Sequence, residues 1–433
     1  MKPTITQADC AALTQPLTAL RRELHRYPEA GWMEYRTTAQ ILQVLQGHGI
    51  SVSYGPSIHA PEKRMGLPSA KADAAAFARA RSEWADGDVL QAMQGGFTGC
   101  IAHLTGARHG PHKVLRVDID CNEVQESSLP DHRPAAEGFS SCHPGLMHAC
   151  GHDGHAAMGV GAALLLNARL KDLPGTVDIL FQPAEEGLRG AASLAEHSCI
   201  RRCNILLGLH IGMGLSGAGR VAASAYGFLS SSKLDAAFHG EAAHAGLCPQ
   251  EGHNALAAAA AAVTNLLAIS RHGDGASRIN IGSLHAESGR NVIPPLAEMS
   301  LETRGASGEI NAYMEASARR VCEAAAQMYG CTCCITPMGG AEGAQCDDSL
   351  VRQVTDILSR FPGIREVVPA WDFRAGEDMT TLMSAVQRHG GRADELVLGS
   401  ELAAPHHSQR FDFDESILPL GAGLLAQLLL ALS

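Results

Sequence analysis

Short apolar runs that are typical of buried strands recur along the chain. Residues 113–119, 176–181, 204–209 and 395–398 are such runs, and residues 156–170, between the first two, form an apolar stretch of helical length. The order strand, helix, strand is that of a βαβ unit, which places its two strands parallel in one sheet. The pattern therefore predicts an α/β fold with a mostly parallel sheet.

Each of these runs ends in or leads into polar residues that can bind a metal ion or transfer a proton. The polar residues are Asp118 and Asp120, Glu185 and Glu186, His210, and His406 and His407. Because ligands collect beyond the carboxyl ends of parallel strands, we expect these side chains to meet at one edge of the sheet.

The middle of the chain follows a different pattern. Residues 232–238, 278–284 and 298–303 alternate between apolar and polar positions, as strands with one buried face do. Two long helix-forming stretches accompany them, one of which is the alanine-rich segment 254–269. This region is typical of an α+β domain with an antiparallel sheet.

The length of the chain also favours two domains. With 433 residues it exceeds the ~250–300 at which a single hydrophobic core usually stops growing. We predict a catalytic domain formed by residues 1–225 and 337–433, into which residues 226–336 are inserted.

Three further segments have clear patterns. Residues 73–84 predict a helix within segment 56–96, whose function cannot be read from composition. Residues 331–338 predict a strand, and its clustered cysteines are expected to pack rather than bind metal. Residues 417–432 are strongly apolar but too short to span a bilayer comfortably, so we expect a buried helix.

Composition excludes several classes of partner. A formal net charge of −11 argues against nucleic acid and against an anionic membrane as the main partner. The thirteen cysteines are an odd number without framework spacing, which suits a reducing compartment. Because the first residues also lack the pattern of a secretory signal peptide, we expect a cytoplasmic protein.

The segment 147–155 is the densest group of ligand-type residues in the chain. It holds three histidines, one cysteine and one aspartate within nine residues. Cys150 and His152 are separated by a single glycine, so a turn can bring both to one ion. The residues alone leave two other interpretations open, a structural role for each residue and a Cys150 nucleophile activated by histidine.

Pooled along the chain, the ligand-type residues exceed what one tetrahedral ion can use, which favours two metal ions. Two ions roughly 3.5 to 4 Å apart can share a ligand and lower the pKa of a water between them. In an extended or loop segment, adjacent Glu185 and Glu186 point apart. One can then bind metal while the other accepts a proton.

Four motifs together resemble a known family. They are residues 148–155 (HACGHDGH), residues 182–187 (QPAEEG), residues 208–210 (GLH) and the late His407. These motifs, in this order, resemble the di-metal amidohydrolases related to aminoacylase and glutamate carboxypeptidase. A narrower match, to the branch that contains aminobenzoyl-glutamate hydrolase, is carried by residues 65–68, 95–99, 405–407 and 411–415.

The resemblance implies a role for each matching residue of the catalytic domain. It implies two divalent ions, Mn or Zn, with these five ligands: Cys150, His152, Glu186, His210 and His407. Cys150 stands where relatives use a bridging aspartate, and Glu185 is implied as the general base. Asp120 matches an aspartate that orients a ligand, whereas Asp118 stands where many relatives carry a ligand histidine.

The inserted region resembles the lid and dimerisation domain of the same family. His244 matches a histidine that reaches the active site of a partner protomer, where it stabilises an oxyanion. Asn291 and Arg304 match residues that hold the substrate, and arginine can bind a carboxylate through two parallel hydrogen bonds. The resemblance implies a homodimer or a heterodimer with a related chain.

The expected activity is hydrolysis of the amide bond of an N-acyl amino acid with a free carboxylate. An acylated glutamate such as p-aminobenzoyl-glutamate, or an acylated aspartate, is the expected substrate. Three alternatives remain: an enzyme for other N-acyl amino acids or auxin-type conjugates, a cysteine hydrolase, and a partner-dependent chain with little activity of its own. Residues 376–378 (GED) resemble a further family motif to which we assign no chemical step.

Overall fold

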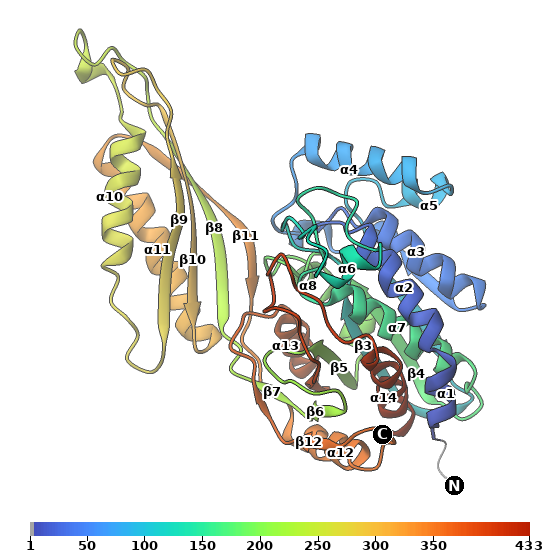
Figure 1. Ribbon diagram of the computed structural model, residues 1–433. Helices are drawn as coiled ribbons and strands as arrows, with labels where there is room; N and C mark the ends of the chain where they lie inside the picture. The colour runs from blue at the N-terminus through green and yellow to red at the C-terminus, as the bar shows by residue number, and fades with distance from the viewer. Residues whose placement is uncertain (1–3) are drawn as a thin grey trace. The chain divides into compact units, whose positions relative to one another are not determined.

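The computed structural model describes residues 4–433 and forms two compact units (Figure 1). Unit 1 contains the described chain up to Tyr226 together with Gln345–Phe373 and Asp378–Ser433. Unit 2 contains Gly227–Ala344 and Arg374–Glu377. Residue 336, where we expected the inserted domain to end, lies within a strand of unit 2 that continues to Ala341.

Unit 1 is built around an eight-stranded mixed sheet. In spatial order its strands are β1 (Ser51–Tyr54), β2 (Cys100–Thr105), β4 (Pro174–Gln182), β3 (Arg108–Asp118), β5 (Ile205–Ile211), β14 (Arg392–Leu398), β6 (Arg220–Ala222) and β12 (Glu366–Val368). The four central strands, β4, β3, β5 and β14, are all parallel. The predicted α/β fold with a mostly parallel sheet is confirmed. A short parallel pair, β7 (Ala225–Tyr226) and β13 (Trp371–Asp372), lies outside this sheet.

Helices cover both faces of the large sheet. The helices of unit 1 are α1 (Gln7–Ala12), α2 (Thr14–Arg26), α3 (Tyr35–Gly47), α4 (Ala70–Glu83), α5 (Gly87–Ala92), α6 (Arg133–Ala136), α7 (His152–Asn167), α8 (Ala191–Leu194), α9 (Ser198–Arg201), α12 (Asp348–Leu358), α13 (Met379–Arg388) and α14 (Ile417–Ala431). Leu207 and Leu209 of β5 share a core cluster with α7 and α14, whereas Gly208, between them, faces Met379 of α13. Alternate residues of one strand thus serve the two helical layers.

Helix α7 is central because it is apolar on nearly all sides. Fourteen of its residues, from His152 to Leu166, are buried. A side chain at Gly159 would collide with Val117 of β3, so glycine is needed for α7 to lie directly on the sheet. This close packing fixes the position of the first turn of α7, which carries His152.

The C-terminal helix α14 is buried, as the apolar segment predicted. It packs with α7 and α2 in the core of unit 1 (Figure 1). Among the described residues, no helix is long and apolar enough to cross a membrane. In segment 56–96, α4 lies close to the expected helix, while α5 was not predicted.

Unit 2 is an α+β domain with an antiparallel sheet, as its alternating pattern predicted. Its four strands, in spatial order, are β11 (Thr332–Ala341), β8 (Ser230–His239), β10 (Leu296–Gly305) and β9 (Ser277–His285). Helices α10 (Ala255–Leu267) and α11 (Gly308–Met328) cover one face of this sheet (Figure 1). Residue burial alternates along β10, because only one side of each strand faces these helices.

Candidate metal centre

The predicted ligand residues meet at the carboxyl ends of the parallel strands of unit 1. Cys150 and Gly151 precede α7, and Glu185 and Glu186 lie in the turn after β4. His210 is near the end of β5, and His407 follows β14. The expectation that these side chains lie together at one edge of the sheet is met in the structure.

Two groups of side chains have ligand atoms within 4.8 Å of one another and share Cys150. One group is Cys150, His152 and His210; the other is Cys150, Glu186 and His407. In the first group, Cys150 Sγ lies 3.6 Å from His210 Nε2. In the second, His407 Nε2 lies 3.5 Å from Glu186 Oε1. This arrangement suits two cations that share one thiolate.

Hydrogen bonds fix the ring orientation of two of these histidines. His152 Nδ1 donates to the backbone oxygen of Asp120 at 3.0 Å, and His210 Nδ1 donates to the backbone oxygen of Ile211 at 2.9 Å. Each bond puts the ring proton on Nδ1 and turns the lone pair of Nε2 toward the centre. Metal-binding histidines are held in this way in most proteins.

Two buried polar atoms at the centre lack a hydrogen-bond partner among the described residues. They are His152 Nε2 and Glu186 Oε1, which lie 4.0 Å apart. A buried polar atom without a partner costs free energy unless a ligand satisfies it. A thiolate, three imidazoles and a carboxylate are ligands that suit Zn and similar borderline ions. The residues therefore fit a divalent metal centre.

Burial shapes the protonation of the centre. It raises the pKa of the Cys150 thiol above its usual value and lowers the pKa of the His210 imidazole well below its usual value. Burial also raises the pKa of the Glu186 carboxyl. Because the thiolate is the reactive form of cysteine, a buried Cys150 thiol is a poor nucleophile on its own.

Asp120 connects His152 with the glutamate pair. Its Oδ1 accepts a hydrogen bond from the backbone N–H of Glu185 at 3.0 Å, and its Oδ2 accepts one from the N–H of Glu186 at 2.9 Å. The same carboxylate lies 3.4 Å from His152 Nδ1. Asp120 is fully buried, so these bonds are shielded from water.

Both carboxylate oxygens of Asp118 accept hydrogen bonds from other side chains. Arg116 Nη1 donates to Oδ2 at 2.7 Å, and His155 Nδ1 donates to Oδ1 at 2.6 Å. His155 Nε2 in turn accepts the backbone N–H of Ile211 at 2.9 Å. Asp118 Oδ1 lies 3.8 Å from His152 Nε2, so Asp118 borders the first ligand group.

The two late histidines have different surroundings. His406 Nε2 donates to the backbone oxygen of Ile211 at 3.1 Å, and its ring packs against Phe411. His407 has a positive φ of 63°, and its backbone N–H donates to the oxygen of Ala149 at 2.8 Å. The left-handed backbone conformation is uncommon for a residue with a side chain and occurs at functional sites. Of the two, His407 is the one in a ligand group.

Asp153 and His148 also belong to the dense segment around Cys150. We expected Asp153 to cap α7, but this is wrong: Gly151 is the N-cap, and Asp153 lies inside the first turn, where it binds Arg21 and His25. The ring of His148 is buried, and neither of its nitrogens has a hydrogen-bond partner in the part of the chain that the structure describes.

The three predicted site residues of unit 2 are His244, Asn291 and Arg304. His244 Nδ1 accepts the backbone N–H groups of Gly246 at 3.1 Å and Leu247 at 3.0 Å, which leaves the ring proton on Nε2. The amide of Asn291 lies 3.4 Å from that Nε2. Arg304 is on β10 and binds the carboxylate of Glu302, with an Nε to Oε1 distance of 2.9 Å.

The sequence patterns did not identify several residues that support the glutamate turn. Gln182 Nε2 and Arg116 Nη2 both donate to Asp378 Oδ1, at 2.7 and 2.8 Å, and the backbone N–H of Ala191 donates to Oδ2. The buried carboxylate of Glu34 accepts the backbone N–H of Ala184 at 2.7 Å. The motif at residues 376–378 was the available signal for Asp378, although its contacts cannot be read from a linear pattern.

Segment 56–96 also contacts the glutamate turn. Arg189 Nε donates to the backbone oxygen of Glu186 at 2.7 Å, and its Nη1 donates to that of Gly66 at 3.1 Å. The indole N–H of Trp32 donates to the backbone oxygen of Met65 at 2.7 Å. Residues 65–66 are thus held beside the turn that carries Glu185 and Glu186.

Comparison with known proteins agrees with this geometry. Residues 114–431 match the family described as Peptidase family M20/M25/M40. The chain belongs to this family. The M20 match covers every catalytic-domain residue in the two ligand groups, together with Asp118, Asp120 and Glu185.

Relatives within the M20 family cover nearly the whole chain. The chain is 41% identical to indole-3-acetyl-aspartic acid hydrolase of Enterobacter agglomerans, over 96% of this chain and 95% of the relative. It is 40% identical to one of the named subunits of p-aminobenzoyl-glutamate hydrolase of Escherichia coli (strain K12), over 96% and 95% of the two chains. The expected enzyme class, a hydrolase of the amidohydrolase and peptidase type, is confirmed.

Solved structures of M20 relatives have the same fold. An aminobenzoyl-glutamate utilization protein from Klebsiella pneumoniae has a TM-score of 0.84 and 34% identity, with 98% of each chain covered. A protein from Bacillus subtilis described as a dinuclear metal-binding peptidase of the M20 family has a TM-score of 0.66 and 25% identity, covering 97% of this chain and 98% of that chain.

Proposed function

We propose that this enzyme hydrolyses the amide bond between an aromatic or similar acyl group and glutamate or aspartate. The observation that carries the proposal is the pair of ligand groups that share Cys150, with Glu185 beside them. The substrates in the names of two relatives, indole-3-acetyl-aspartate and p-aminobenzoyl-glutamate, both join an acyl group with an aromatic ring to an acidic amino acid.

Two divalent ions, Mn or Zn, are held in this proposal by Cys150, His152, Glu186, His210 and His407. When bound, they polarise the scissile carbonyl and lower the pKa of a water to near neutrality. Cys150 bridges the two ions because it is the residue common to both ligand groups. The hydrogen bonds of His152 and His210 to backbone oxygens support their role as Nε2 ligands.

Glu185 is the general base in this mechanism. It accepts a proton as water attacks the carbonyl carbon and passes that proton to the nitrogen of the leaving amino acid. Glu185 is buried and lies near the ligands, with its Oε2 4.0 Å from His152 Nε2. Asp120 holds the backbone of Glu185, so we assign to it the positioning of the base.

His244, Asn291 and Arg304 complete the proposed site. His244 donates a hydrogen bond from Nε2 to the oxyanion that forms at the carbonyl, which agrees with the acceptance of two backbone N–H groups by its Nδ1. Arg304 and Asn291 bind the free carboxylate of the substrate. In this proposal His244 acts in the site of a second protomer, within a homodimer or a heterodimer with a related chain.

A second possibility is that the chain needs a different partner for activity. It is favoured by the name of one relative, which describes that protein as one subunit of its enzyme. Activity of the purified chain alone, with its oligomeric state measured in parallel, separates the two possibilities.

The compartment proposed is the cytoplasm. All thirteen cysteines, from Cys10 to Cys346, are free thiols in the structure. Free thiols in this number suit a reducing environment.

The test is a substrate panel with the purified chain, stripped of metal and then supplied with Mn²⁺ or Zn²⁺. The panel varies the acyl group and the amino acid separately. We expect hydrolysis of p-aminobenzoyl-glutamate and indole-3-acetyl-aspartate, loss of activity on chelation, and recovery on adding metal. Activity that survives exhaustive chelation but is lost on cysteine alkylation would instead support a cysteine hydrolase.

A further inference from the structure

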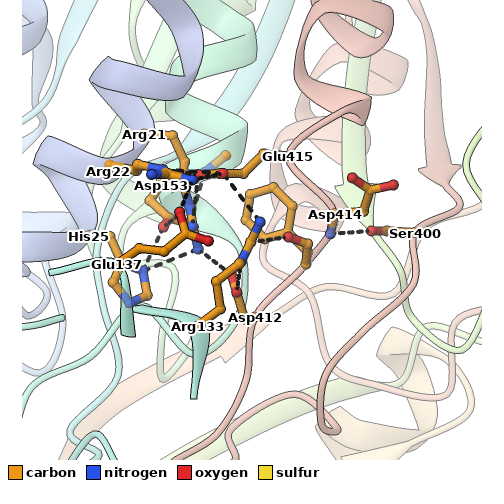
Figure 2. A network of polar contacts seen from close by, with 12 residues as sticks. Arg21, Arg22, His25, Arg133, Glu137, Asp153, Ser400, Asp412, Asp414 and Glu415 are labelled. Atoms are coloured by element: carbon orange, nitrogen blue, oxygen red, sulfur yellow. Dashed lines mark hydrogen bonds and ion pairs between the residues drawn. The ribbon is translucent and has the colours of Figure 1, made fainter. Parts of the chain in front are cut away.

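Arg21 of α2 is a fully buried cation that binds three carboxylates from two separate segments. Its Nε donates to Asp153 Oδ2 at 2.8 Å, its Nη2 to Asp412 Oδ1 at 2.9 Å and its Nη1 to Glu415 Oε1 at 3.2 Å (Figure 2). We call these four residues the Arg21 network.

The two segments that Arg21 joins both carry candidate metal ligands. Asp153 is the neighbour of His152 in the first turn of α7. Asp412 and Glu415 belong to motif 411–415, which follows His407 in the chain and has no role in the proposed reaction. The network therefore ties the His407 segment to the turn that bears His152.

Further contacts close the same junction. The Phe413 ring lies under the Arg21 guanidinium, 4.5 Å from ring centre to Cζ. A side chain at Gly154 of α7 would collide with that ring, so Gly154 allows Phe413 to pack on the first turn. Arg133 donates to Asp412 Oδ2 and to the backbone oxygen of Phe413, at 2.6 Å in both cases (Figure 2).

The two ligand groups depend on this junction to different degrees. His152 and His210 are oriented by hydrogen bonds to the backbone oxygens of Asp120 and Ile211, which Arg21 does not touch. His407 follows β14 in an irregular segment, and its backbone N–H bonds to Ala149, which precedes α7. The Arg21 network is thus the main side-chain anchor of the His407 segment on α7.

We propose that Arg21 is a positioning residue for metal binding, which holds the His407 segment against the first turn of α7 so that Glu186 and His407 can bind a second divalent ion beside Cys150. This inference rests on the proposed function, because it takes the shared-thiol metal centre as given. It assigns a role to motif 411–415, whose acidic residues act on the centre through Arg21.

Arg22 offers a matched control, because it binds the same segment without reaching α7. Its Nη2 lies 2.6 Å from Glu415 Oε2, and its other carboxylate partner is Glu137. A change at Arg22 therefore removes an ion pair with motif 411–415 while leaving the bonds of Arg21 to Asp153 and Asp412 in place.

The test compares Mn²⁺ binding to the full-length chain after chelator treatment, for the unchanged protein and for Asp412→Asn, Arg21→Lys and Arg22→Gln. Free Mn²⁺ is followed by electron paramagnetic resonance, and the folding of each metal-free chain by circular dichroism. Asp412→Asn preserves the shape of the side chain, so it keeps the test valid if loss of the buried Arg21 fork prevents folding. Loss of a residue that orients a ligand typically weakens metal binding by roughly 10–100-fold.

We expect the unchanged protein to bind two ions. In Asp412→Asn and Arg21→Lys, the weaker dissociation constant should rise at least about tenfold and the tighter one by less than about threefold. Arg22→Gln should leave both nearly unchanged. A loss that is only structural would instead lower both affinities together with folding.

Two results would overturn the inference in distinguishable ways. If the unchanged protein binds two ions and Asp412→Asn binds both with normal affinity, the role of Arg21 is wrong and the proposed function stands. If the unchanged protein binds no divalent ion, the proposed metal centre fails and the inference fails with it.

Discussion

The backbone N–H of Glu185 donates a hydrogen bond to Asp120 Oδ1 at 3.0 Å, across the ends of two neighbouring strands. The other carboxylate oxygen accepts the N–H of Glu186 at 2.9 Å. One buried side chain after β3 thus sets the position of both glutamates after β4. The proposed base and the proposed ligand are oriented by a residue that needs no contact with the substrate.

Replacement of Asp120 by asparagine tests this positioning. An amide NH₂ cannot accept the N–H of Glu186, so one bond is lost and the glutamate turn loosens. We expect kcat to fall by roughly 10–100-fold and metal affinity to weaken in parallel. Asp178→Asn is the control, because Asp178 is a buried carboxylate that binds His103 and His112 instead. Equal kcat values for the two variants would contradict the role of Asp120.

The pH dependence of metal binding tests the protonation of Cys150. Burial raises the pKa of this thiol, so the metal-free protein carries a proton there that must leave when a cation binds. The affinity for Mn²⁺ or Zn²⁺ should therefore increase with pH, by about tenfold per pH unit for each proton released. Titration calorimetry in buffers of different ionisation enthalpy counts the protons. Affinity that is independent of pH between 6 and 8 would show that Cys150 is not a thiolate ligand.

Substitution of Arg304 by methionine tests recognition of the substrate carboxylate. A hydrogen bond to a charged group contributes about 1.5 to 3 kcal/mol, so kcat/KM for an N-acyl glutamate should fall by roughly 10–150-fold. The control is the same variant with a substrate whose α-carboxylate is amidated, for which kcat/KM should change little. If both substrates lose activity equally, Arg304 supports the sheet of unit 2 rather than the substrate.

Lys113 provides a prediction on stability rather than activity. This side chain on β3 is buried, its single hydrogen bond goes to the backbone oxygen of Leu432 at 3.4 Å, and burial lowers its pKa to about 8. A lysine with a lowered pKa binds its proton more tightly when unfolded, so stability rises as pH increases from about 8 towards the unfolded value of 10.5. Lys113→Met should raise the free energy of unfolding at pH 7 by roughly 1–3 kcal/mol.

Urea denaturation at pH 7 and at pH 10 checks that prediction. The gain from Lys113→Met should shrink at the higher pH, where the lysine is neutral in the folded protein. A gain that is the same at both pH values would mean that packing, not charge burial, separates the two proteins.

Much of the fold could be predicted because it follows from local pattern. The apolar runs before Asp118, Glu185 and His210 are the parallel strands β3, β4 and β5, and βαβ geometry brings their carboxyl ends together. The alternating residues of β10 likewise indicated an antiparallel sheet.

The remaining features depend on long-range contacts that no local pattern records. Asp153 has the sequence position of a helix cap, yet it binds Arg21, which is 132 residues away in the chain. Asp378 supports the glutamate turn through Arg116, which lies 262 residues earlier. Such partners are set by tertiary packing, which also decides whether a buried polar group is satisfied.

The central claim is that Glu185 is the general base beside two metal ions. It is tested most directly by measuring the metal content and the turnover of Glu185→Gln with p-aminobenzoyl-glutamate. The account predicts that the variant binds two ions, as the unchanged protein does, while kcat falls by roughly 10²–10⁴-fold, since glutamine cannot accept the proton. Near-normal turnover with both ions bound would contradict the assignment of the base.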